Sequence, residues 1–487
     1  MQRLSVLLIA ATMATAAHGQ QENWQIEFVA DQVTKPEVRV DSQGRSHMAY
    51  MLESLTGGVY YSVRDDDGDW IRNTIADGYF YAPLDLTIDD DDVIHVAYHD
   101  HDHEDIVYAT GSDDDWALEV IADDSHDGWD GRIAVDPAGD IHIVSIDPSQ
   151  FGSTSGVEWA TRRNGTWQVE EIGSGPIPYE FGISMALSDD GRLHVAYHDG
   201  DMSLNTTGPG ADLVYAVLSD GQWQLEPVDT DGDVGKFPSI ALDSADRPHI
   251  SYLDRTTQTA GRLKYAFHDG DQWRVEVVDE LNNLEIAFLG ARRTTAVAMD
   301  DEDNAYVAYS DKSVLRFAKK MENGWAIEDV TGPMADDHEL AQFVSLEVEG
   351  NGRPHMAFYE TVNGAQSPSG RVYYAVGPDV VVEPTAIVEE TKMTPDSFEL
   401  GQNYPNPFNP NTVIPYSLTA NTVVEIAVYD LAGQLVRELT QGIQQAGFYE
   451  IQWDGRDKAG RDTASGVYSI RMQAGGLNQV RKMLLLR

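Results

Sequence analysis

Seven tryptophans recur along this 487-residue chain, and their spacing constrains its fold more than any other feature. The intervals between them are 46, 46, 51, 56, 50 and 52 residues, for Trp24, Trp70, Trp116, Trp167, Trp223, Trp273 and Trp325. Each tryptophan follows a polar turn, and the residues between turns alternate between apolar and polar, as in half-buried strands. A period of about 50 residues made of four short strands predicts a β-propeller with one blade per repeat.

One repeat shows the four strands clearly, from inner to outer: Phe237–Asp243, His249–Tyr252, Leu263–Ala266 and Trp273–Val278. Seven equivalent first strands predict seven blades; they end at Asp41, Asp89, Asp136, Ser188, Asp243, Asp300 and Glu349. The last repeat lacks a closing tryptophan, whereas the chain opens with an unpaired outer strand at Trp24–Val29. We therefore expect the N-terminal strand to complete the last blade, so that the ring closes without an open edge.

The charge of the chain is strongly negative and unevenly distributed. The formal net charge is −48, and residues 398–487 contain eight basic and eight acidic residues, so the rest of the chain carries all of it. Such a surface repels phosphates, which excludes nucleic acid as a partner. The acidity fits either a solvated surface or the binding of divalent cations. Cysteine is absent, which excludes disulfides, cysteine-based zinc sites and a cysteine nucleophile.

Residues 1–19 are predicted to be a secretory signal peptide. Arg3 precedes an apolar run, Leu4–Ala14, that is too short to span a membrane, which takes about 20 residues. Ala17-His18-Gly19 supplies small residues for cleavage before Gln20. No later segment has the length and hydrophobicity of a membrane helix, so we expect no transmembrane segment. We expect the mature protein to be a monomer.

Several motifs near the C-terminus occur in a fixed order. They are Leu400-Gly-Gln-Asn-Tyr-Pro-Asn-Pro-Phe-Asn-Pro410, Val428-Tyr-Asp-Leu-Ala-Gly433, Trp453-Asp-Gly-Arg-Asp-Lys-Ala-Gly460, Ala464-Ser-Gly-Val-Tyr468 and Lys482-Met-Leu-Leu-Leu-Arg487. Residues 398–487 thereby resemble the type A sorting domain of the type IX secretion system, which has a hook-capping-like immunoglobulin fold. The resemblance implies recognition by the secretion machinery and a protein secreted from, or held on the outer-membrane surface of, a Gram-negative bacterium.

The predicted organisation is therefore all-β, a seven-bladed β-propeller followed by a small Ig-like β-sandwich. The propeller covers residues 20–377, a Pro/Glu/Thr-rich linker covers 378–397, and the sorting domain covers 398–487. Strand alternation places the short first-to-second and third-to-fourth turns on one face, here called the short-turn face. The opposite, variable face carries the longer and dissimilar loops: 99–105, 199–212, 229–236, 281–294 and 361–371. Loops on a rigid scaffold carry function, so we expect the site on the variable face.

The third-to-fourth turns resemble the Asp-box of sialidase-like propellers. Asn164-Gly-Thr-Trp167 and Ser219-Asp-Gly-Gln-Trp223 match it best. That box is structural, which implies that aspartate and glycine form the turn while tryptophan packs between blades. A histidine also recurs at the start of the second strand, and Tyr306 replaces it in blade six: His47, His95, His142, His194, His249 and His355. A residue repeated in nearly every blade predicts a structural hydrogen bond to the neighbouring turn.

Candidate ligand-binding residues lie where second strands reach the variable face, or just before first strands. They are Tyr98, Asp100, Asp147, Tyr197, His198, Asp199, Asp254, Arg292, Arg293, Asp311 and Glu360. A carboxylate rim suits Ca²⁺, a cationic ligand or the hydroxyls of a sugar, although each aspartate also fits a simple capping role. Basic residues beside the channel are the candidates for an anionic sugar: Lys35, Arg132, Lys236, Arg292 and Arg293.

Two segments carry metal-ligand chemistry. Alternation in an extended segment places His99, His101 and His103 on one side, where three imidazoles could hold a transition metal. Asp229, Asp231 and Asp233 have the spacing of a calcium loop, but the downstream glutamate and flanking helices of an EF-hand are missing. The alternative for the histidine segment is a solvated, charged loop, and any Ca²⁺ site at the aspartates would be of another type than an EF-hand.

The sequence favours a non-catalytic binding protein whose extracellular ligand is a glycan, with Ca²⁺ or a transition metal as possible ions. Two alternatives stay open. One is a carbohydrate-active enzyme, either a sialidase-like glycosidase or a polysaccharide lyase using tyrosine and histidine near an arginine. The other is a module that binds a surface protein or mediates adhesion.

Overall fold

The computed structural model describes residues 24–486. Its gaps are 53–56, 81–82, 102–104, 113–114, 122–127, 148–154, 176–181, 200–211, 220, 257–259, 283–293, 311–313, 333–337, 363–369, 379–398, 402, 404–405, 407, 420–421, 432, 445–446, 459–460 and 475–476. The described residues form strands, turns and bends, without a helix that could cross a membrane. The predicted signal peptide and nearly all of the predicted linker lie outside them. The chain divides into two compact units, residues 1–381 and 382–487.

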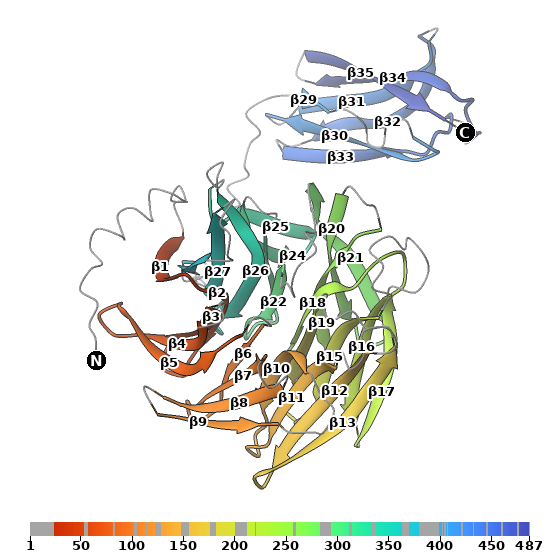
Figure 1. Ribbon diagram of the computed structural model, residues 1–487. Helices are drawn as coiled ribbons and strands as arrows, with labels where there is room; N and C mark the ends of the chain where they lie inside the picture. Colours follow the sequence, from red (N-terminus) through yellow and green to blue (C-terminus); the bar gives the residue numbers. More distant parts are fainter. Residues whose placement is uncertain are drawn as a thin grey trace. The chain divides into compact units, whose positions relative to one another are not determined.

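Seven antiparallel four-stranded sheets are arranged around a central axis, which confirms the predicted propeller (Figure 1). Blades one to three are β2 (Thr34–Val40), β3 (Ser46–Leu52), β4 (Gly57–Arg64), β5 (Trp70–Gly78); β6 (Asp85–Ile88), β7 (Ile94–Asp100), β8 (Asp105–Ser112), β9 (Asp115–Val120); and β10 (Trp129–Val135), β11 (Ile141–Asp147), β12 (Ser155–Arg163), β13 (Thr166–Gly175). Blades four to six are β14 (Ile183–Leu187), β15 (Leu193–Asp199), β16 (Asp212–Ser219), β17 (Gln222–Asp229); β18 (Lys236–Leu242), β19 (Pro248–Asp254), β20 (Ala260–His268), β21 (Trp273–Asn282); and β22 (Thr295–Met299), β23 (Ala305–Ser310), β24 (Leu315–Met321), β25 (Gly324–Asp329).

The seventh blade is built from both ends of the propeller sequence. Its strands are β26 (His338–Val348), β27 (Pro354–Val362), β28 (Gly370–Val376) and the N-terminal β1 (Gln25–Asp31). Strand β1 pairs antiparallel with β28, with Gln25 opposite Val376 and Asp31 opposite Arg371. The predicted closure by the N-terminal strand is therefore confirmed.

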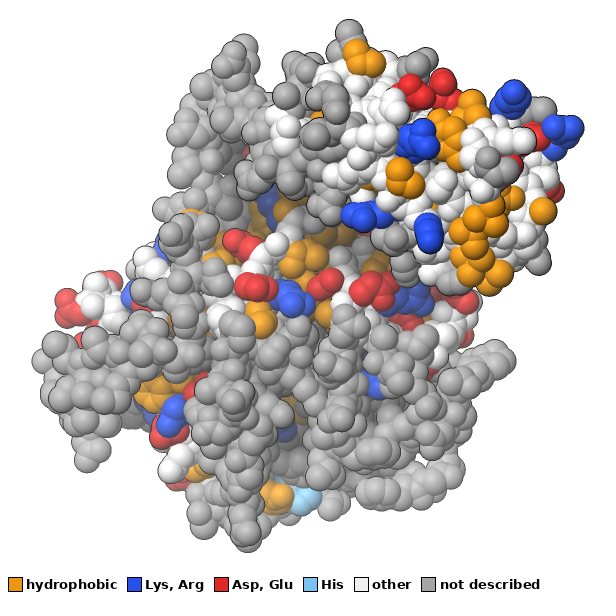
Figure 2. All heavy atoms as spheres, turned by 90° about the horizontal axis from the view of Figure 1, so that it is seen from above, with side chains coloured by type: hydrophobic (Ala, Val, Ile, Leu, Met, Phe, Trp, Pro, Cys, Tyr) orange, Lys and Arg blue, Asp and Glu red, His pale blue; other side chains and the backbone are white. Residues whose placement is uncertain are grey.

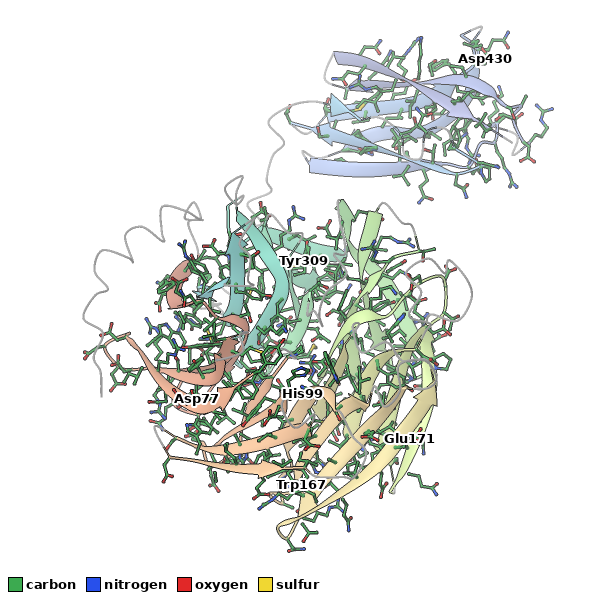
Figure 3. The ribbon with its side chains drawn as sticks, in the orientation of Figure 1. Asp77, His99, Trp167, Glu171, Tyr309 and Asp430 are labelled. Carbon is green, nitrogen blue, oxygen red and sulfur yellow. The ribbon has the colours of Figure 1, made fainter. Side chains whose placement is uncertain are left out.

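Each pair of neighbouring blades shares a hydrophobic core, and the tryptophan at the start of the outer strand closes it. The tryptophan ring packs edge-on against an aromatic ring of the third strand of the blade before it, as Trp116 does on Tyr61 and Trp325 does on Tyr265. In blade seven Trp24 fills this position against Phe317 at 5.3 Å. The predicted packing of tryptophan between blades is thus confirmed, with Trp167 at the periphery of the ring (Figure 3).

The recurrent histidines are structural, as predicted. His95 Nε2 lies 3.1 Å from the Asp89 carboxylate, and its Nδ1 lies 2.8 Å from the Tyr108 hydroxyl. The same carboxylate contact occurs at His47, His142, His249 and His355, and Tyr306 donates to Asp300 in blade six. Ser188 replaces the carboxylate in blade four, and among the described residues His194 Nε2 has no hydrogen-bond partner.

Acid is expected to destabilise the propeller between pH 6.5 and about pH 4. Burial lowers the pKa of each recurrent histidine below the usual 6.5, and brings the pKa of His194 to about 4. The unfolded chain then binds more protons than the folded chain in this range, so the free energy of unfolding falls as the pH drops. Urea unfolding at pH 7.5, 6 and 5 measures how steeply the free energy of unfolding changes with pH. His194→Gln should make this change smaller. An equal free energy of unfolding at pH 7.5 and 5 would contradict the expectation.

Three short turns carry aspartate in the left-handed conformation where four others carry glycine. These are Asp92, Asp246 and Asp303, with φ of 59°, 57° and 62°. Each aspartate reaches the turn of the preceding blade. Asp303 accepts hydrogen bonds from the Ser244 amide at 2.7 Å and the Ser244 hydroxyl at 2.8 Å. The left-handed backbone strain is offset by these contacts between blades.

Replacing Asp303 tests whether the hydrogen bonds between blades offset the backbone strain. Asp303→Ala should lower the free energy of unfolding by about 1–2 kcal/mol, because it loses both hydrogen bonds and keeps the strain. Asp303→Gly should lower it less, because glycine adopts a positive φ without steric cost. Chemical denaturation of the two variants gives the order, and a glycine variant less stable than the alanine variant would contradict the argument.

The C-terminal unit is a separate β-sandwich. One sheet contains β29 (Glu399–Leu400), β30 (Thr412–Leu418) and β33 (Gly447–Trp453). The other contains β32 (Leu435–Gln444), β31 (Thr422–Tyr429), β34 (Gly466–Ala474) and β35 (Leu477–Leu485). Its own core includes Ile426, Trp453 and Ile470. Several large apolar side chains are nevertheless exposed, including Leu431 at the β31–β32 turn, and apolar side chains gather on its surface in Figure 2.

Candidate functional site

The predicted carboxylate rim divides into two kinds of hairpin end on the variable face. In blades two and four, an aspartate at the end of the second strand faces another aspartate, as Asp100 faces Asp105 and Asp199 faces Asp212. In blades five and seven the partner is an arginine: Arg262 lies 2.6 Å from Asp254, and Arg371 lies 3.4 Å from Glu360. Among the described hairpin ends of this face, those of blades two and four therefore pair two acidic residues, and those of blades five and seven pair an acidic with a basic residue.

A polar network joins blades four and five in the described part of this face. The buried Asp229 carboxylate accepts hydrogen bonds from the Tyr252 hydroxyl at 2.7 Å and Lys264 Nζ at 2.8 Å. Lys264 also lies 3.0 Å from Asp254, whose other oxygen accepts two hydrogen bonds from Thr256. Asp254 in turn anchors Arg262, whose side chain is 39% exposed. The network thus holds the accessible guanidinium of Arg262 against a buried carboxylate. This limits the conformational entropy that the arginine side chain would lose on binding a ligand.

Blades six and seven also hold an arginine side chain against a carboxylate. Arg316 lies 3.3 Å from Asp279 of the preceding blade and 3.1 Å from Asp329, and the Tyr309 hydroxyl donates to the same Asp279. Arg371 is 46% exposed and is held by Glu360. Anchored basic side chains therefore follow one another at the start of the third strands of blades five, six and seven.

Blades two and three present aromatic rings instead. His101 packs edge-on against Tyr79 at 4.7 Å, and His99 packs against Trp129 at 5.4 Å. His99 is buried, whereas Tyr79, His101 and Trp129 are partly exposed beside Asp100 and Asp105. Figure 3 places His99 near the centre of the ring of blades. Ring faces next to carboxylates suit a sugar, because the ring covers apolar C–H groups and the carboxylate accepts from hydroxyls.

Three consecutive residues at the junction of blades four and five have pKa values that differ from their usual ones. Burial and the nearby Lys236 lower the pKa of His198 to about 3, and burial raises the pKa of Tyr197 to about 12. Burial, followed by the charge of Asp212, raises the pKa of Asp199. His198 is therefore a neutral imidazole at physiological pH, with its Nδ1 2.7 Å from the Val234 carbonyl oxygen.

The candidate metal ligands are occupied by other contacts of the chain. Asp229 binds Lys264 and Tyr252, and Asp233 lies 2.8 Å from Lys236 Nζ. His103 lies outside the described residues, and the rings of His99 and His101 are 6.2 Å apart. No group of three histidine or carboxylate side chains in the described part of the chain is placed to hold a metal ion. Asp229 and Asp233 of the predicted calcium loop are thus engaged by other side chains, whereas the predicted histidine site, which includes His103, stays a prediction.

The remaining candidates fall into two groups. Arg292, Arg293 and Asp311 lie outside the described residues, as does the side chain of Asp147, whose backbone pairs with Gly156. Tyr98, Tyr197 and His198 are buried beneath the variable face. Lys35, Arg132 and Lys236 were expected to reach an anionic sugar but are also buried, and Arg132 is held 3.2 Å from Asp130. Three described cations of this face that do reach the surface, Arg262, Arg316 and Arg371, were missed.

A sequence signal for the missed cations exists. Each third strand carries an aromatic residue at an equivalent position. In blades five to seven a basic residue lies one or three positions before it: Arg262 and Lys264 before Tyr265, Arg316 before Phe317, and Arg371 before Tyr374. In blades two to four these positions contain Asp105, Glu158 and Asp212. Aligning the repeats by their rings, instead of by their first strands, would have revealed the contrast.

Comparison with known proteins supports the architecture. Residues 411–477 match the family model of the FlgD Ig-like domain, so the C-terminal unit is Ig-like. No curated protein matches the chain. Among solved structures, an ulvan lyase of a new polysaccharide lyase family, bound to -[GlcA(1-4)Rha3S]-, has a TM-score of 0.52 at 14% identity, covering 72% of this chain and 95% of its own. At that identity the likeness shows the shared propeller fold.

A second solved structure is more distant. The α-L-arabinofuranosidase of Fusarium graminearum in complex with arabinobiose has a TM-score of 0.42 at 12% identity. The match covers 60% of this chain and 92% of the arabinofuranosidase.

Proposed function

We propose that the propeller binds an extracellular glycan that carries acidic groups, on its variable face. The observation that carries this proposal is the division of that face into two chemically different parts. Blades five to seven present anchored arginines, whereas blades two and three present aromatic rings beside carboxylates. Arginine forks match carboxylate and sulfate groups, and rings stack on neutral sugar faces. The ligand bound by the ulvan lyase, which contains glucuronate and sulfated rhamnose, is of this chemical class.

A glycan array followed by calorimetry tests the proposal. The protein should bind polysaccharides that alternate uronate or sulfated units with less polar sugars, and it should bind neutral polysaccharides more weakly. The affinity should fall as salt is raised, because charge contacts at an exposed face are screened. Binding limited to neutral glycans, or to none, would overturn the proposal, and capture of a surface protein instead would favour the adhesion alternative.

A polysaccharide lyase or glycosidase is the second candidate. It is supported by the propeller fold that the chain shares with the ulvan lyase. Incubation with bound polysaccharides separates the candidates: a rise in absorbance from unsaturated products indicates a lyase, new reducing ends alone indicate a glycosidase, and neither indicates a binding protein.

We also propose that the C-terminal unit directs export through a type IX secretion system to the surface or medium of a Gram-negative bacterium. The C-terminal sequence motifs and the Ig-like family match support this role. Deleting residues 398–487 should then leave the propeller in the periplasm of a host that has this system. Equal export of the shortened and full chains would exclude the role.

A further inference from the structure

One face of the sheet β32-β31-β34-β35 points away from the core of the C-terminal sandwich. Ile426, Ile470 and Met483, from three of these strands, belong to that core. Successive side chains of a strand point to opposite sides of its sheet, so the residues between the core positions lie on the other side, here called the outer face. The outer face includes Glu425, Ala427, Tyr429, Leu435, Glu438, Ser469, Arg471, Val480 and Lys482.

The strand register aligns four side chains across the middle of the outer face. Ala427 on β31 lies opposite Glu438 of β32 on one side and opposite Arg471 of β34 on the other. Arg471 in turn lies opposite Val480 of β35. Glu425 precedes Ala427 by two residues and so lies on the same face. The outer face therefore carries two glutamates on its β31–β32 half and an arginine on its β34–β35 half.

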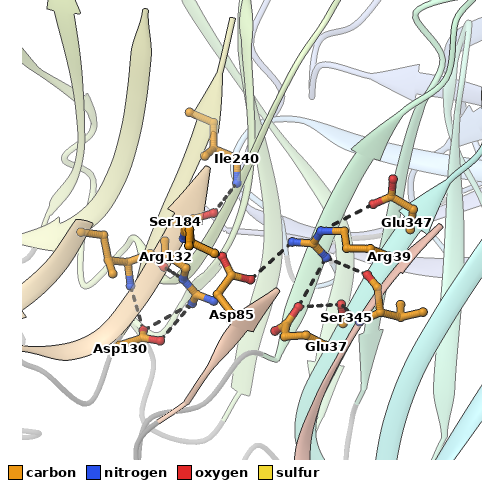
Figure 4. A network of polar contacts seen from close by, with 12 residues as sticks. Glu37, Arg39, Asp85, Asp130, Arg132, Ser184, Ile240, Ser345 and Glu347 are labelled. Atoms are coloured by element: carbon orange, nitrogen blue, oxygen red, sulfur yellow. Dashed lines mark hydrogen bonds and ion pairs between the residues drawn. The ribbon is translucent and has the colours of Figure 1, made fainter. Parts of the chain in front are cut away.

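Arg471 is held differently from other arginines of the molecule. In the polar network at the axis of the propeller, Arg39 lies 3.4 Å from Asp85 (Figure 4). Three arginines of the C-terminal unit lie 2.8–3.2 Å from aspartates: Arg437, Arg456 and Arg461. Within the described residues Arg471 has no ion pair. Its guanidinium lies over the Tyr429 ring, 4.7 Å from the ring centre, and its Nε has no hydrogen-bond partner there. The ring thus orients a guanidinium that can form ion pairs with a partner molecule.

The surroundings of Arg471 on this face are apolar. Ala427, at the centre, is 2% exposed and has a small side chain, so another sheet could approach closely there. Leu435 and Val480, on either side, are 45% and 51% exposed, so burying them against a partner would be favourable. Arginine and tyrosine are enriched among the residues that contribute most to protein–protein binding. The outer face thus has the composition of a protein interface.

We propose that the outer face binds the same face of a second copy of this chain, in a dimer with two-fold symmetry. A two-fold axis parallel to the strands, between β31 and β34, places the arginine half of each face over the glutamate half of the other. Arg471 of one copy then lies over Ala427 of the other copy, beside its Glu438. Opposite charges on the two halves make the face complementary to itself. Such a dimer would replace the monomer expected from the sequence, and it depends on neither the glycan nor the export proposal.

Sedimentation equilibrium of the purified full chain tests the proposal, at concentrations up to about 100 μM because one small sheet face forms a small interface. The wild-type protein should dimerise. Arg471→Glu and Glu438→Arg should each weaken the dimer at least about 100-fold, because each of the two symmetric contacts becomes repulsive. The double variant Arg471→Glu/Glu438→Arg should regain most of the affinity. An equal mixture of the two single variants should form a heterodimer, because both of its contacts join opposite charges.

The matched control is Arg456→Glu, which makes the same change of charge away from the outer face. Arg456 is 55% exposed, pairs with Asp462 and follows β33 of the other sheet, so its replacement should leave the dimer unchanged. Thermal unfolding shows whether each variant is folded. Should Arg471→Glu fail to fold, Glu438→Arg still tests the contact, because Glu438 is exposed. A monomeric wild type, equal weakening by Arg471→Glu and Arg456→Glu, or a double variant as weak as the single ones would each overturn the proposal.

Discussion

Replacing Trp24 by alanine is expected to lower the free energy of unfolding of the propeller by about 3–5 kcal/mol, the usual cost of truncating a buried aromatic residue. Trp24 is 4% exposed, packs on Phe317 and joins the core between blades six and seven. It also immediately precedes the N-terminal strand β1, which completes blade seven. Because the other strands of that blade lie more than 300 residues later in the chain, this truncation weakens the contact that closes the ring.

Urea denaturation measures the effect, and limited proteolysis reports whether blade seven opens. Val275→Ala is a suitable control, because Val275 also lies on an outer strand but is 42% exposed, and it should change the free energy by less than about 0.5 kcal/mol. Trp24→Phe should recover part of the loss. A Trp24→Ala protein with nearly wild-type stability would show that the ring closes without this contact.

Replacing Arg262 by alanine is expected to weaken binding of an acidic glycan about 10- to 100-fold, the range for a hydrogen bond between charged groups. Asp254 anchors Arg262 at 2.6 Å and is 1% exposed, so the guanidinium is oriented before the ligand arrives. Arg262→Lys should bind more weakly than the wild type, because an ammonium group cannot form the two parallel hydrogen bonds of a guanidinium. Titration calorimetry with the best ligand from the array gives the affinities.

Arg247→Ala is the matched control for this experiment. Arg247 belongs to the same blade, is 42% exposed and lies 2.6 Å from Asp243, which is 2% exposed, but it sits on the short-turn face. The two variants remove the same charge and the same kind of anchored contact. An equal loss of glycan binding in both would mean that net charge, and not the variable face, determines the affinity.

Much of the architecture follows from local patterns in the sequence. The tryptophan period, the turn residues and the two-residue alternation predicted seven blades, and the missing tryptophan of the last repeat predicted the closure by β1. The structural role of the recurrent histidines was also predictable, because His47 and Asp41 keep the same spacing as His95 and Asp89. Such features depend on residues that are close in the chain or repeated at one period.

The chemistry of the candidate site could be predicted only in part. Asp100, Asp199, Asp254 and Glu360 were correctly placed at the variable ends of the second strands, but their partners were not foreseeable from those positions alone. Asp254 meets Arg262 across a hairpin, whereas Asp199 meets Asp212, so equivalent carboxylates acquire opposite environments. The burial of Lys35, Arg132 and Lys236 depends on bulges at the start of the first strands, which leave no signal in the residue pattern.

The sequence by itself determined the repeat, the number of blades, the closing strand and the division between propeller and C-terminal unit, because each of these depends on periodicity or composition. Tertiary structure decided which of the described cations reach the variable face and which carboxylates are neutralised. Those outcomes depend on contacts between blades about 50 residues apart, as when Asp229 of blade four meets Lys264 of blade five. The burial of a charge is set by all the neighbours that the closed ring brings together, and no single repeat contains that information.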